Sequence, residues 1–398
     1  MGINKKYSGY KSYQFLEKGK DYKEFKLAKE VGRVEPYEVP LTAPEKERVK
    51  AIAEKCVVIS LHDHPVVLTE DMAQLFEYNN QGRYCTAYEG LSASCLDAVF
   101  DGLMAASCTI TSKRGWKWTD VIYDLGIRLS DLSHQDFLIK CERVDDILTA
   151  HREGKIALVP SLESCTMIEN ELDRIDILYG LGVRMMGLVY SESNSLGSGL
   201  REEKDGGLTY FGLEAIARMN KIGMAIDLSH CGEQTARDAI AASKNPVFIT
   251  HTGARSLWEA KRLKTDSVLH LCADKGGIVG IEAAPHTTIT RKNPEHDIES
   301  FMEHFEYVKD LVGIDHVGFG PDTTYGDHVA LHHAFASLLS IKQMSTPDRA
   351  VKYVKGLENP SEASWNIIRW LVKHGYSDVE IEKAVGGNAL RVLRTIWV

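Results

Sequence analysis

The sequence predicts an α/β protein, a (β/α)8 TIM barrel with a binuclear metal site at the carboxyl ends of its strands. Short apolar runs with the length of buried parallel strands each end on a residue that can bind a metal ion. Each run is followed by a turn and a helical pattern. Side chains at the carboxyl ends of many parallel strands converge only when the sheet closes into a barrel. The residues so placed are His62, His64, Glu163, His230, His251 and Asp322.

The expected strands and helices alternate along the chain. We expect strands at 56–61, 96–103, 156–162, 183–189, 224–228, 247–250, 277–282 and 316–320. Helices are expected at 44–55, 118–141, 169–180, 210–221, 233–243, 267–275 and 298–311, and a further one ends at Gly154. Residues 66–118 are expected to form a long loop over the barrel mouth apart from the second strand, and residues 356–394 to form two or three helices.

The chain is expected to consist of an N-terminal arm, residues 1–45, and a barrel with C-terminal helices, residues 46–398. A barrel of ~250 residues with insertions accounts for the length without a second domain. Pro36, Pro40 and Pro44 interrupt any helix in the arm. The arm is expected to pack on the barrel or on a neighbouring subunit of a homo-oligomer.

Composition and charge limit the classes of binding partner that are expected. The net charge is −9 and no block of like charge stands out, so neither nucleic acid nor an anionic membrane surface is expected as a partner. The first residues lack the apolar core of a signal peptide, and no run approaches the ~20 apolar residues of a membrane span. The eight cysteines form no C-x-x-C pair. Free thiols and a cytoplasmic location are therefore expected.

The pair His62 and His64 follows the first apolar run. Residues two apart in a strand project from the same face, so both imidazoles are expected to point into the barrel mouth, with Asp63 turned away. Two histidines this close also occur by chance, and their position at a strand end is what favours metal binding.

Glu163 directly follows another apolar run, IALVPSL. A carboxylate at the end of a buried strand costs several kcal/mol unless it is paired or bound to a metal. Its two oxygens can bridge two divalent ions. The alternative is a salt bridge to an arginine.

His230 and His251 end two successive runs and supply neutral nitrogen ligands for a second ion. A single histidine at a strand end is more often a core or loop residue, but here two occur one βα unit apart. Asp227 and Ser229 flank the first of these strands and are expected to support the ligands, although Asp227 also suits a local cap.

Asp322, after the last strand, suits a general base that carries a proton to a leaving nitrogen. Metal coordination lowers the pKa of a bound water toward ~7, which makes hydroxide available at neutral pH. The alternative is a turn aspartate in the sequence PDTTYG. Six other histidines are expected on helix surfaces without a function: His134, His151, His270, His296, His304 and His374.

In combination and order, five segments resemble the membrane (renal) dipeptidases, peptidase family M19 of the amidohydrolase superfamily. They are IDLSH, ITHTGARS, VGFGPD, GLEN and GGNALRV, and the resemblance runs from Glu47 to Arg394. It implies a (β/α)8 barrel with two zinc ions bridged by Glu163. It also implies that His62 and His64 bind one ion, that His230 and His251 bind the other, and that Asp322 is the acid/base. Arg262 matches the arginine that holds the substrate carboxylate.

Two positions depart from the family pattern. The first strand of the family carries His-x-Asp, where this chain has His64, so the site loses one negative charge. At the end of the fourth strand the family has a histidine that polarises the scissile carbonyl, and Tyr190 stands there instead. A tyrosine donates a hydrogen bond to an oxyanion but carries no positive charge.

Three functions follow as hypotheses. The first is a binuclear zinc-dependent hydrolase that cleaves the amide bond of a dipeptide or of a related N-acyl or modified amino acid. The second keeps the fold but acts on another amide, such as a lactam, a cyclic imide or a specialised metabolite. The third is a non-catalytic metal-binding barrel, and the presence of Asp322 argues against it because a binding module needs no acid/base.

Overall fold

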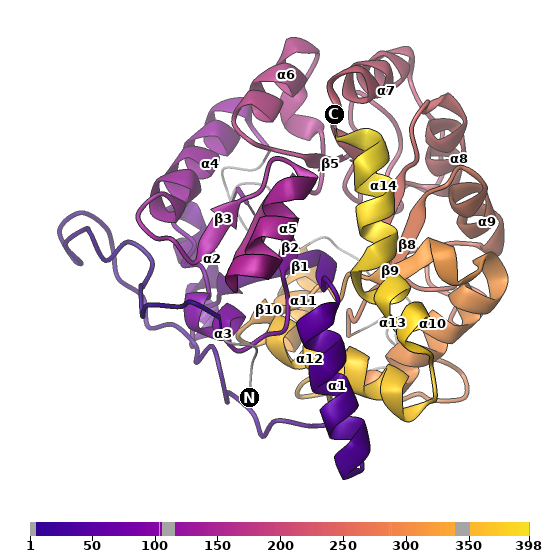
Figure 1. Cartoon of the computed structure of the whole chain (residues 1–398). Helices are drawn as coiled ribbons and strands as arrows, with labels where there is room; N and C mark the ends of the chain where they lie inside the picture. The colour runs from indigo at the N-terminus through magenta and orange to yellow at the C-terminus, as the bar shows by residue number, and fades with distance from the viewer. Residues whose placement is uncertain are drawn as a thin grey trace.

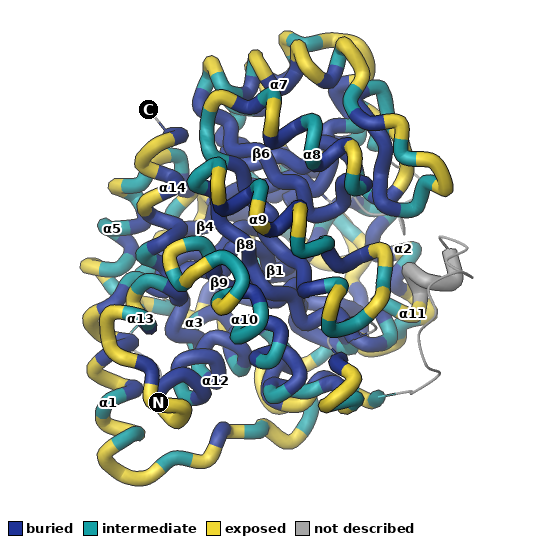
Figure 2. Tube along the Cα trace, turned by 90° about the vertical axis from the view of Figure 1, so that its right-hand side faces the viewer, coloured by how far each residue is buried: buried dark blue, intermediate teal, exposed yellow. Residues whose placement is uncertain are grey.

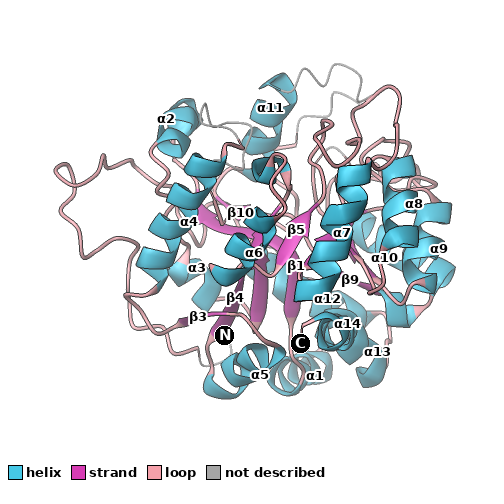
Figure 3. Ribbon diagram, turned by 90° about the horizontal axis from the view of Figure 1, so that it is seen from above, coloured by secondary structure: helices cyan, strands magenta, loops and turns pink. Residues whose placement is uncertain are grey.

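A parallel sheet curled into a barrel forms the centre of the structure, a computed structural model (Figures 1 and 3). It describes residues 5–102, 104–105, 116–285, 287, 289–338 and 351–397, without the side chains of 334–338. Neighbouring strands follow the order β10-β1-β2-β4-β5-β6-β7-β8-β9, and β3 pairs with β4. The strands are β1 (Ile59–Val67), β2 (Ala98–Asp101), β3 (Leu138–Lys140), β4 (Ile156–Leu162), β5 (Met185–Gly187), β6 (Ala225–Asp227), β7 (Phe248–Thr252), β8 (Ile278–Ile281), β9 (Val317–Phe319) and β10 (Thr324–Tyr325).

The barrel closes where the last strand returns to the first. The chain continues from β9 into β10, which pairs in parallel with β1. The backbone N–H of Asp322 donates to the carbonyl of His62 at 3.0 Å, and that of His64 donates to the carbonyl of Thr323 at 2.8 Å. The predicted fold class, a parallel α/β barrel, is confirmed.

Helices surround the strands (Figure 3). Capping residues mark several of their ends. Asp297 accepts a hydrogen bond from Ser300 N at the start of α10, and Gly154 ends α5 in the left-handed conformation. The helices are α1 (Ala43–Lys55), α2 (Leu75–Asn80), α3 (Tyr88–Ser92), α4 (Trp118–Leu132), α5 (Val144–Glu153), α6 (Asp173–Gly180), α7 (Tyr210–Ile222), α8 (Glu233–Ala242), α9 (Asp266–Asp274), α10 (Ile298–Val312), α11 (His328–Leu338), α12 (Pro360–Lys373), α13 (Asp378–Glu382) and α14 (Asn388–Ile396).

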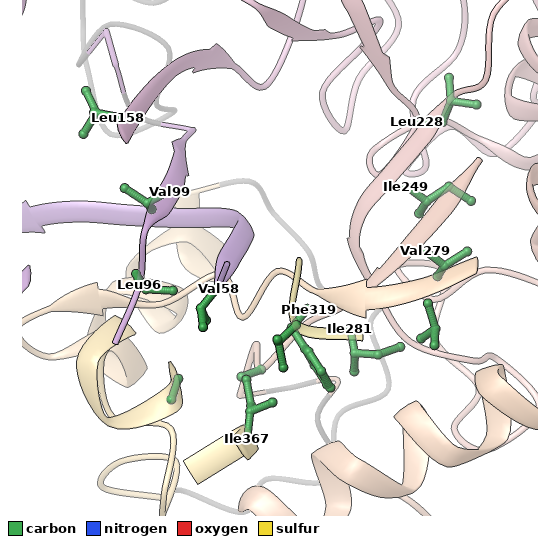
Figure 4. Close-up of a cluster of buried hydrophobic side chains, with 14 of the residues drawn as sticks. Val58, Leu96, Val99, Leu158, Leu228, Ile249, Val279, Ile281, Phe319 and Ile367 are labelled. Atoms are coloured by element: carbon green, nitrogen blue, oxygen red, sulfur yellow. The ribbon is translucent and has the colours of Figure 1, made fainter. Parts of the chain in front are cut away.

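Two apolar clusters fill the two faces of the sheet, and Figure 2 shows the labelled strands as dark blue, buried chain. The inner cluster fills the barrel and joins side chains of α14, including Leu393. The outer cluster lies between the sheet and the helices, and Figure 4 shows part of it, with Phe319 of β9 and Ile367 of α12. Alternation along β2 fits this division, because Val99 belongs to the outer cluster while Ala98 and Phe100 belong to the inner one.

An irregularity in β1 decides where its polar side chains point. Ile59 and Leu61 belong to the inner cluster, so strict alternation would direct Asp63 inward. The register between β1 and β2 shifts between Ser60 and Asp63. Such a bulge resets the alternation. His62 and His64 therefore face the barrel mouth, and Asp63 accepts hydrogen bonds from Ser60 Oγ and Thr323 N on the other side.

The structure corrects four of the expectations above. The first strand does not stop at Leu61, because β1 continues to Val67 along β10. The helix expected at 118–141 ends at Leu132, since the Gln135 side chain bonds Leu132 O and Leu138 N and turns the chain into β3. Residues 66–118 hold the short helices α2 and α3 in their described part. Two of the six histidines assigned to helix surfaces are buried: His296 and His304.

The N-terminal arm contacts the barrel at several points, and one loop of the arm projects from the body (Figure 1). The Lys5 ammonium lies 3.0 Å from a buried oxygen of Asp97. Asp131 of α4 accepts hydrogen bonds from Tyr10 Oη, Tyr13 N and Tyr88 Oη. The arm is thus attached through groups that are removed from water. The division of the chain at residue 45 stays a prediction.

Two further properties concern the expected environment. Within the described ranges, no helix is long and apolar enough to cross a membrane. The seven cysteines that lie in those ranges are free thiols, six of them buried.

We predict that Asp131→Asn loosens the arm. The substitution removes a buried charge that accepts from two phenols and one backbone N–H, and hydrogen bonds to charged groups contribute about 2 kcal/mol each. The free energy of unfolding is expected to fall by at least that amount, and limited proteolysis within residues 5–41 to become faster. Glu214→Gln, an exposed change on α7, is the matched control. Unchanged proteolysis in Asp131→Asn would contradict the anchoring role.

Candidate metal centre

The six residues predicted to form the metal site lie together at the carboxyl ends of the strands. His62 Nε2 is 3.0 Å from Glu163 Oε1 and 3.6 Å from Asp322 Oδ1. His64 Nε2 is 2.9 Å from the same Asp322 oxygen and 3.5 Å from Glu163 Oε1. Strands β1, β4 and the segment after β9 therefore deliver their side chains to one buried point.

His230 and His251 complete the cluster from β6 and β7. Their Nε2 atoms are 3.1 Å apart, and the His251 ring stacks on that of His62 with 3.6 Å between centroids. A hydrogen bond of 2.7 Å joins Thr250 Oγ1 to His251 Nδ1. Because the Nδ1 atom is engaged in this way, Nε2 is the nitrogen that faces the centre.

A network around Asp227 fixes the two strands that carry these histidines. Asp227 Oδ1 accepts from Ser229 Oγ at 2.7 Å and from Thr250 N at 2.8 Å. Ser229 Oγ in turn accepts from His251 N. Asp227 and Ser229 thus join β6 to β7 behind the imidazoles, as expected from their position.

Two glycines allow the backbone to approach residues of the cluster closely. A Cβ at Gly102 would lie 2.3 Å from Cε1 of His62, and a Cβ at Gly187 would lie 2.2 Å from the carbonyl oxygen of Glu163. Any side chain at either position would displace His62 or Glu163.

The backbone of Asp322 is strained. Its φ angle is +61°, a left-handed conformation that non-glycine residues rarely adopt. The neighbouring Thr323 is held by Asp63, whose Oδ1 accepts from both the N–H and the hydroxyl of Thr323 at 2.8 Å. Asp63 therefore secures the turn that aims the Asp322 carboxylate into the centre.

Burial controls the charges of the cluster. Burial holds the pKa values of His230 and His251 well below the usual range, so both imidazoles are neutral at neutral pH. Burial also opposes the charged form of His62, but hydrogen bonds to Asp322 and Glu163 raise its pKa to about 10. Hydrogen bonds from His62 and His64 hold the pKa of Asp322 well below its usual range against its burial.

These residues fit a divalent metal ion. Ligand atoms of His62, Glu163, His251 and Asp322 all lie within 4.8 Å of one another and are buried. Two buried carboxylates require positive charge nearby, and imidazoles are the groups that face them. A mixed set of imidazole nitrogens and carboxylate oxygens is a donor set that suits zinc and other first-row divalent ions.

The two predicted substrate-binding residues flank the cluster. The Tyr190 ring stacks on His230, with 4.2 Å between centroids and an interplanar angle of 21°. Arg262 is buried, and its Nη1 donates to the carbonyl of Ser229 at 3.2 Å. Sequence reasoning missed Glu282, a buried carboxylate whose Oε2 lies 2.6 Å from Arg262 Nη2. Like Glu163, Glu282 directly follows a barrel strand, so the same signal was present.

Comparison with known proteins identifies the family. A family model for the membrane dipeptidases (Peptidase family M19) matches residues 46–336. The chain belongs to this family. The resemblance found from the motifs is therefore confirmed.

Relatives in this dipeptidase family are moderately similar. Dipeptidase tcpJ of Claviceps purpurea (strain 20.1) is 29% identical over 276 residues, 69% of this chain and 58% of that protein. Dipeptidase verJ of Clonostachys rogersoniana is 27% identical over 323 residues, 80% of this chain and 74% of that protein. The match thus spans less than two thirds of tcpJ. The crystal structure of an amidohydrolase from Pseudomonas aeruginosa has a TM-score of 0.70 at 26% identity and covers 88% of this chain and 99% of that one.

We predict that Glu163→Gln binds less metal. The substitution removes the negative charge whose Oε1 lies between two imidazoles from β1, and leaves the volume of the side chain unchanged. Metal analysis of the purified protein is expected to show the loss of at least one equivalent relative to wild type, and activity to fall with it. His230→Ala is expected to lose the ion that is assigned to His230 and His251. Two tightly bound ions in Glu163→Gln would refute a bridging role.

Proposed function

We propose that this chain is a hydrolase that uses two divalent metal ions, most favourably zinc, to cleave the amide bond of a dipeptide or of a related N-acyl or modified amino acid. The observation that supports it is the convergence of four imidazoles and two carboxylates at one end of the barrel. Membership of the dipeptidase family supports the reaction class. We propose a cytoplasmic location from the free thiols.

His62 and His64 would hold one ion, His230 and His251 the other, and Glu163 would bridge them. Bound there, the ions supply Lewis acidity and lower the pKa of water toward ~7. Burial keeps His230 and His251 neutral, and Thr250 and Ser229 orient His251. The site thus has its geometry before substrate enters.

Asp322 would act as the acid/base. Its low pKa keeps the carboxylate ionised, so it can take a proton from the attacking water. It then gives this proton to the leaving nitrogen. Asp322 lies in a strained turn, which leaves its carboxylate little freedom to move. Such a fixed position suits a group that takes a proton from the water and gives it to the leaving nitrogen.

Tyr190 would donate a hydrogen bond to the developing oxyanion. Burial holds the pKa of its phenol well above the usual value, so the group stays protonated and neutral. A neutral donor stabilises an oxyanion less than an imidazolium does. The neutral donor therefore favours the second hypothesis as the alternative. In that hypothesis the substrate is a non-dipeptide amide, such as a lactam, a cyclic imide or a specialised metabolite. A non-catalytic metal-binding barrel remains the third hypothesis and would show no turnover of any amide.

Replacing the acid/base tests the reaction. Asp322→Asn is expected to lower kcat by ~10² or more, in the range of general acid–base contributions. Most of the bound metal is expected to remain, because the two imidazole pairs and Glu163 are intact. Steady-state kinetics and metal analysis on the same preparation check both points. An unchanged kcat would refute the role, and a complete loss of metal would make Asp322 a ligand instead.

Exchanging the oxyanion donor tests the substrate class. Tyr190→His is expected to raise kcat/KM for simple dipeptides by about tenfold or more, because removing such a donor altogether costs ~3 kcal/mol and an imidazolium adds charge. Tyr190→Phe, which lacks the hydroxyl, is the control and is expected to be slower than wild type. Panels of L,L and L,D dipeptides would be measured. A wild-type kcat/KM of ~10⁵–10⁶ M⁻¹s⁻¹ on this panel would show an ordinary dipeptidase.

A further inference from the structure

The guanidinium of Arg262 is held by a carboxylate of the protein itself. Glu282, directly after β8, places Oε2 at 2.6 Å from Arg262 Nη2, and the two side chains are 1% and 7% exposed. The other terminal nitrogen of Arg262 donates to the carbonyl of Ser229, next to His230. Both ends of the guanidinium are therefore in contact with the barrel wall beside the metal centre.

The contact between Arg262 and Glu282 is a close ion pair. Arg262 Nη2 and Glu282 Oε2 are close, yet neither has a hydrogen-bond partner of acceptable geometry. Glu282 Oε1 accepts from Thr287 Oγ1 at 2.7 Å, which fixes the carboxylate in place. The buried guanidinium and the buried carboxylate thus form a close ion pair that lacks the geometry of an ideal hydrogen bond.

In its ionised form Glu282 cancels the charge of Arg262; burial raises the pKa of Glu282 to about 7, and Arg262 opposes this rise. A substrate carboxylate beside Arg262 would place a second anion against one guanidinium, close to Glu282 and not far from Asp322, whose charge also acts on Glu282. Two carboxylates sharing one buried cation repel each other, and one of them must take up a proton or stay away. A neutral group that both donates and accepts carries no such cost.

We propose that Glu282 determines the specificity of this site: by neutralising Arg262 it makes the pocket accept a neutral amide at the C-terminal side of the scissile bond in preference to a free carboxylate. The amide oxygen accepts from Arg262 and its N–H donates to Glu282. The substrate class is then a peptide or acyl amino acid whose carboxyl group is itself an amide, as in a carboxamide or a ring amide. This inference rests on the proposed function.

Glu282 is a positioning residue in this scheme, because it acts through Arg262. The test uses a matched pair of substrates, a dipeptide and its C-terminal carboxamide, with the metal-loaded full chain. In wild type, kcat/KM is expected to be at least as high for the carboxamide as for the free acid. A tenfold preference of wild type for the free acid would overturn the proposal without any variant.

A second test uses the variant Glu282→Gln. It frees the charge of Arg262, so the ratio of kcat/KM for free acid over carboxamide is expected to rise at least tenfold, mainly through a lower KM for the free acid. Glu282→Asp keeps the charge and is expected to keep the wild-type preference. Glu38→Gln, in the surface pair with Arg369, is the matched control for removing a carboxylate from an arginine. An equal fall on both substrates in Glu282→Gln would reveal a structural role and sink the proposal.

Binding separates this inference from the proposed reaction. If wild type turns over neither substrate, the proposed function fails, and calorimetric binding of the same two compounds to the metal-loaded protein still measures the preference. Tighter binding of the carboxamide that reverses in Glu282→Gln supports the role of Glu282. A preference for the free acid in both proteins refutes it.

Discussion

Closure of the barrel between its first and last strands is the constraint on which the metal centre depends. The hydrogen bonds from Asp322 N to His62 O and from His64 N to Thr323 O connect residues about 260 positions apart. Without them, the histidines of β1 and the carboxylate after β9 would lie at opposite edges of an open sheet. Asp63 lies between the two histidines in sequence. Its carboxylate accepts a hydrogen bond from the Thr323 hydroxyl on the outer side of the sheet, and this bond stabilises the same closure.

Much of this arrangement could be predicted from the sequence because apolar runs and their terminal residues carry the information. The strand 156–162 and the helix that ends at Gly154 agree with the structure to the residue. The extent of β1 could not be predicted, since the polar residues 62–64 and Pro65 interrupt its apolar pattern and the strand continues there by pairing with β10. The bulge at Ser60 is likewise a property of strand pairing, which local composition does not encode.

The predicted site residues converge because each follows an apolar run that forms a strand. Their electrostatic partners lie on other segments and are not indicated by such a pattern. Arg262 could be placed near the site by its resemblance to a family motif, but its pairing with Glu282 depends on how two different loops approach each other. His304 shows the same limit. Its sequence position indicates an exposed helix face, yet its Nδ1 accepts from Ala254 N and its Nε2 contacts Ile289 O, so it is buried between two loops at the barrel mouth.

The anchoring of the arm has a consequence for the order in which the chain acquires its structure during synthesis. The arm precedes the barrel in the chain, but Arg33 bonds to Glu358 and Val39 to Asn366, residues 325 and 327 positions later. Such contacts cannot form until residues 358–366 have been synthesised, and long sequence separation slows their formation. The segment from Arg33 to Val39 therefore reaches its final place only after the barrel strands have been made. A chain interrupted before α12 would lack the partners of this segment, while the contacts of Lys5 with Asp97 and of Tyr10 with Asp131 could still form.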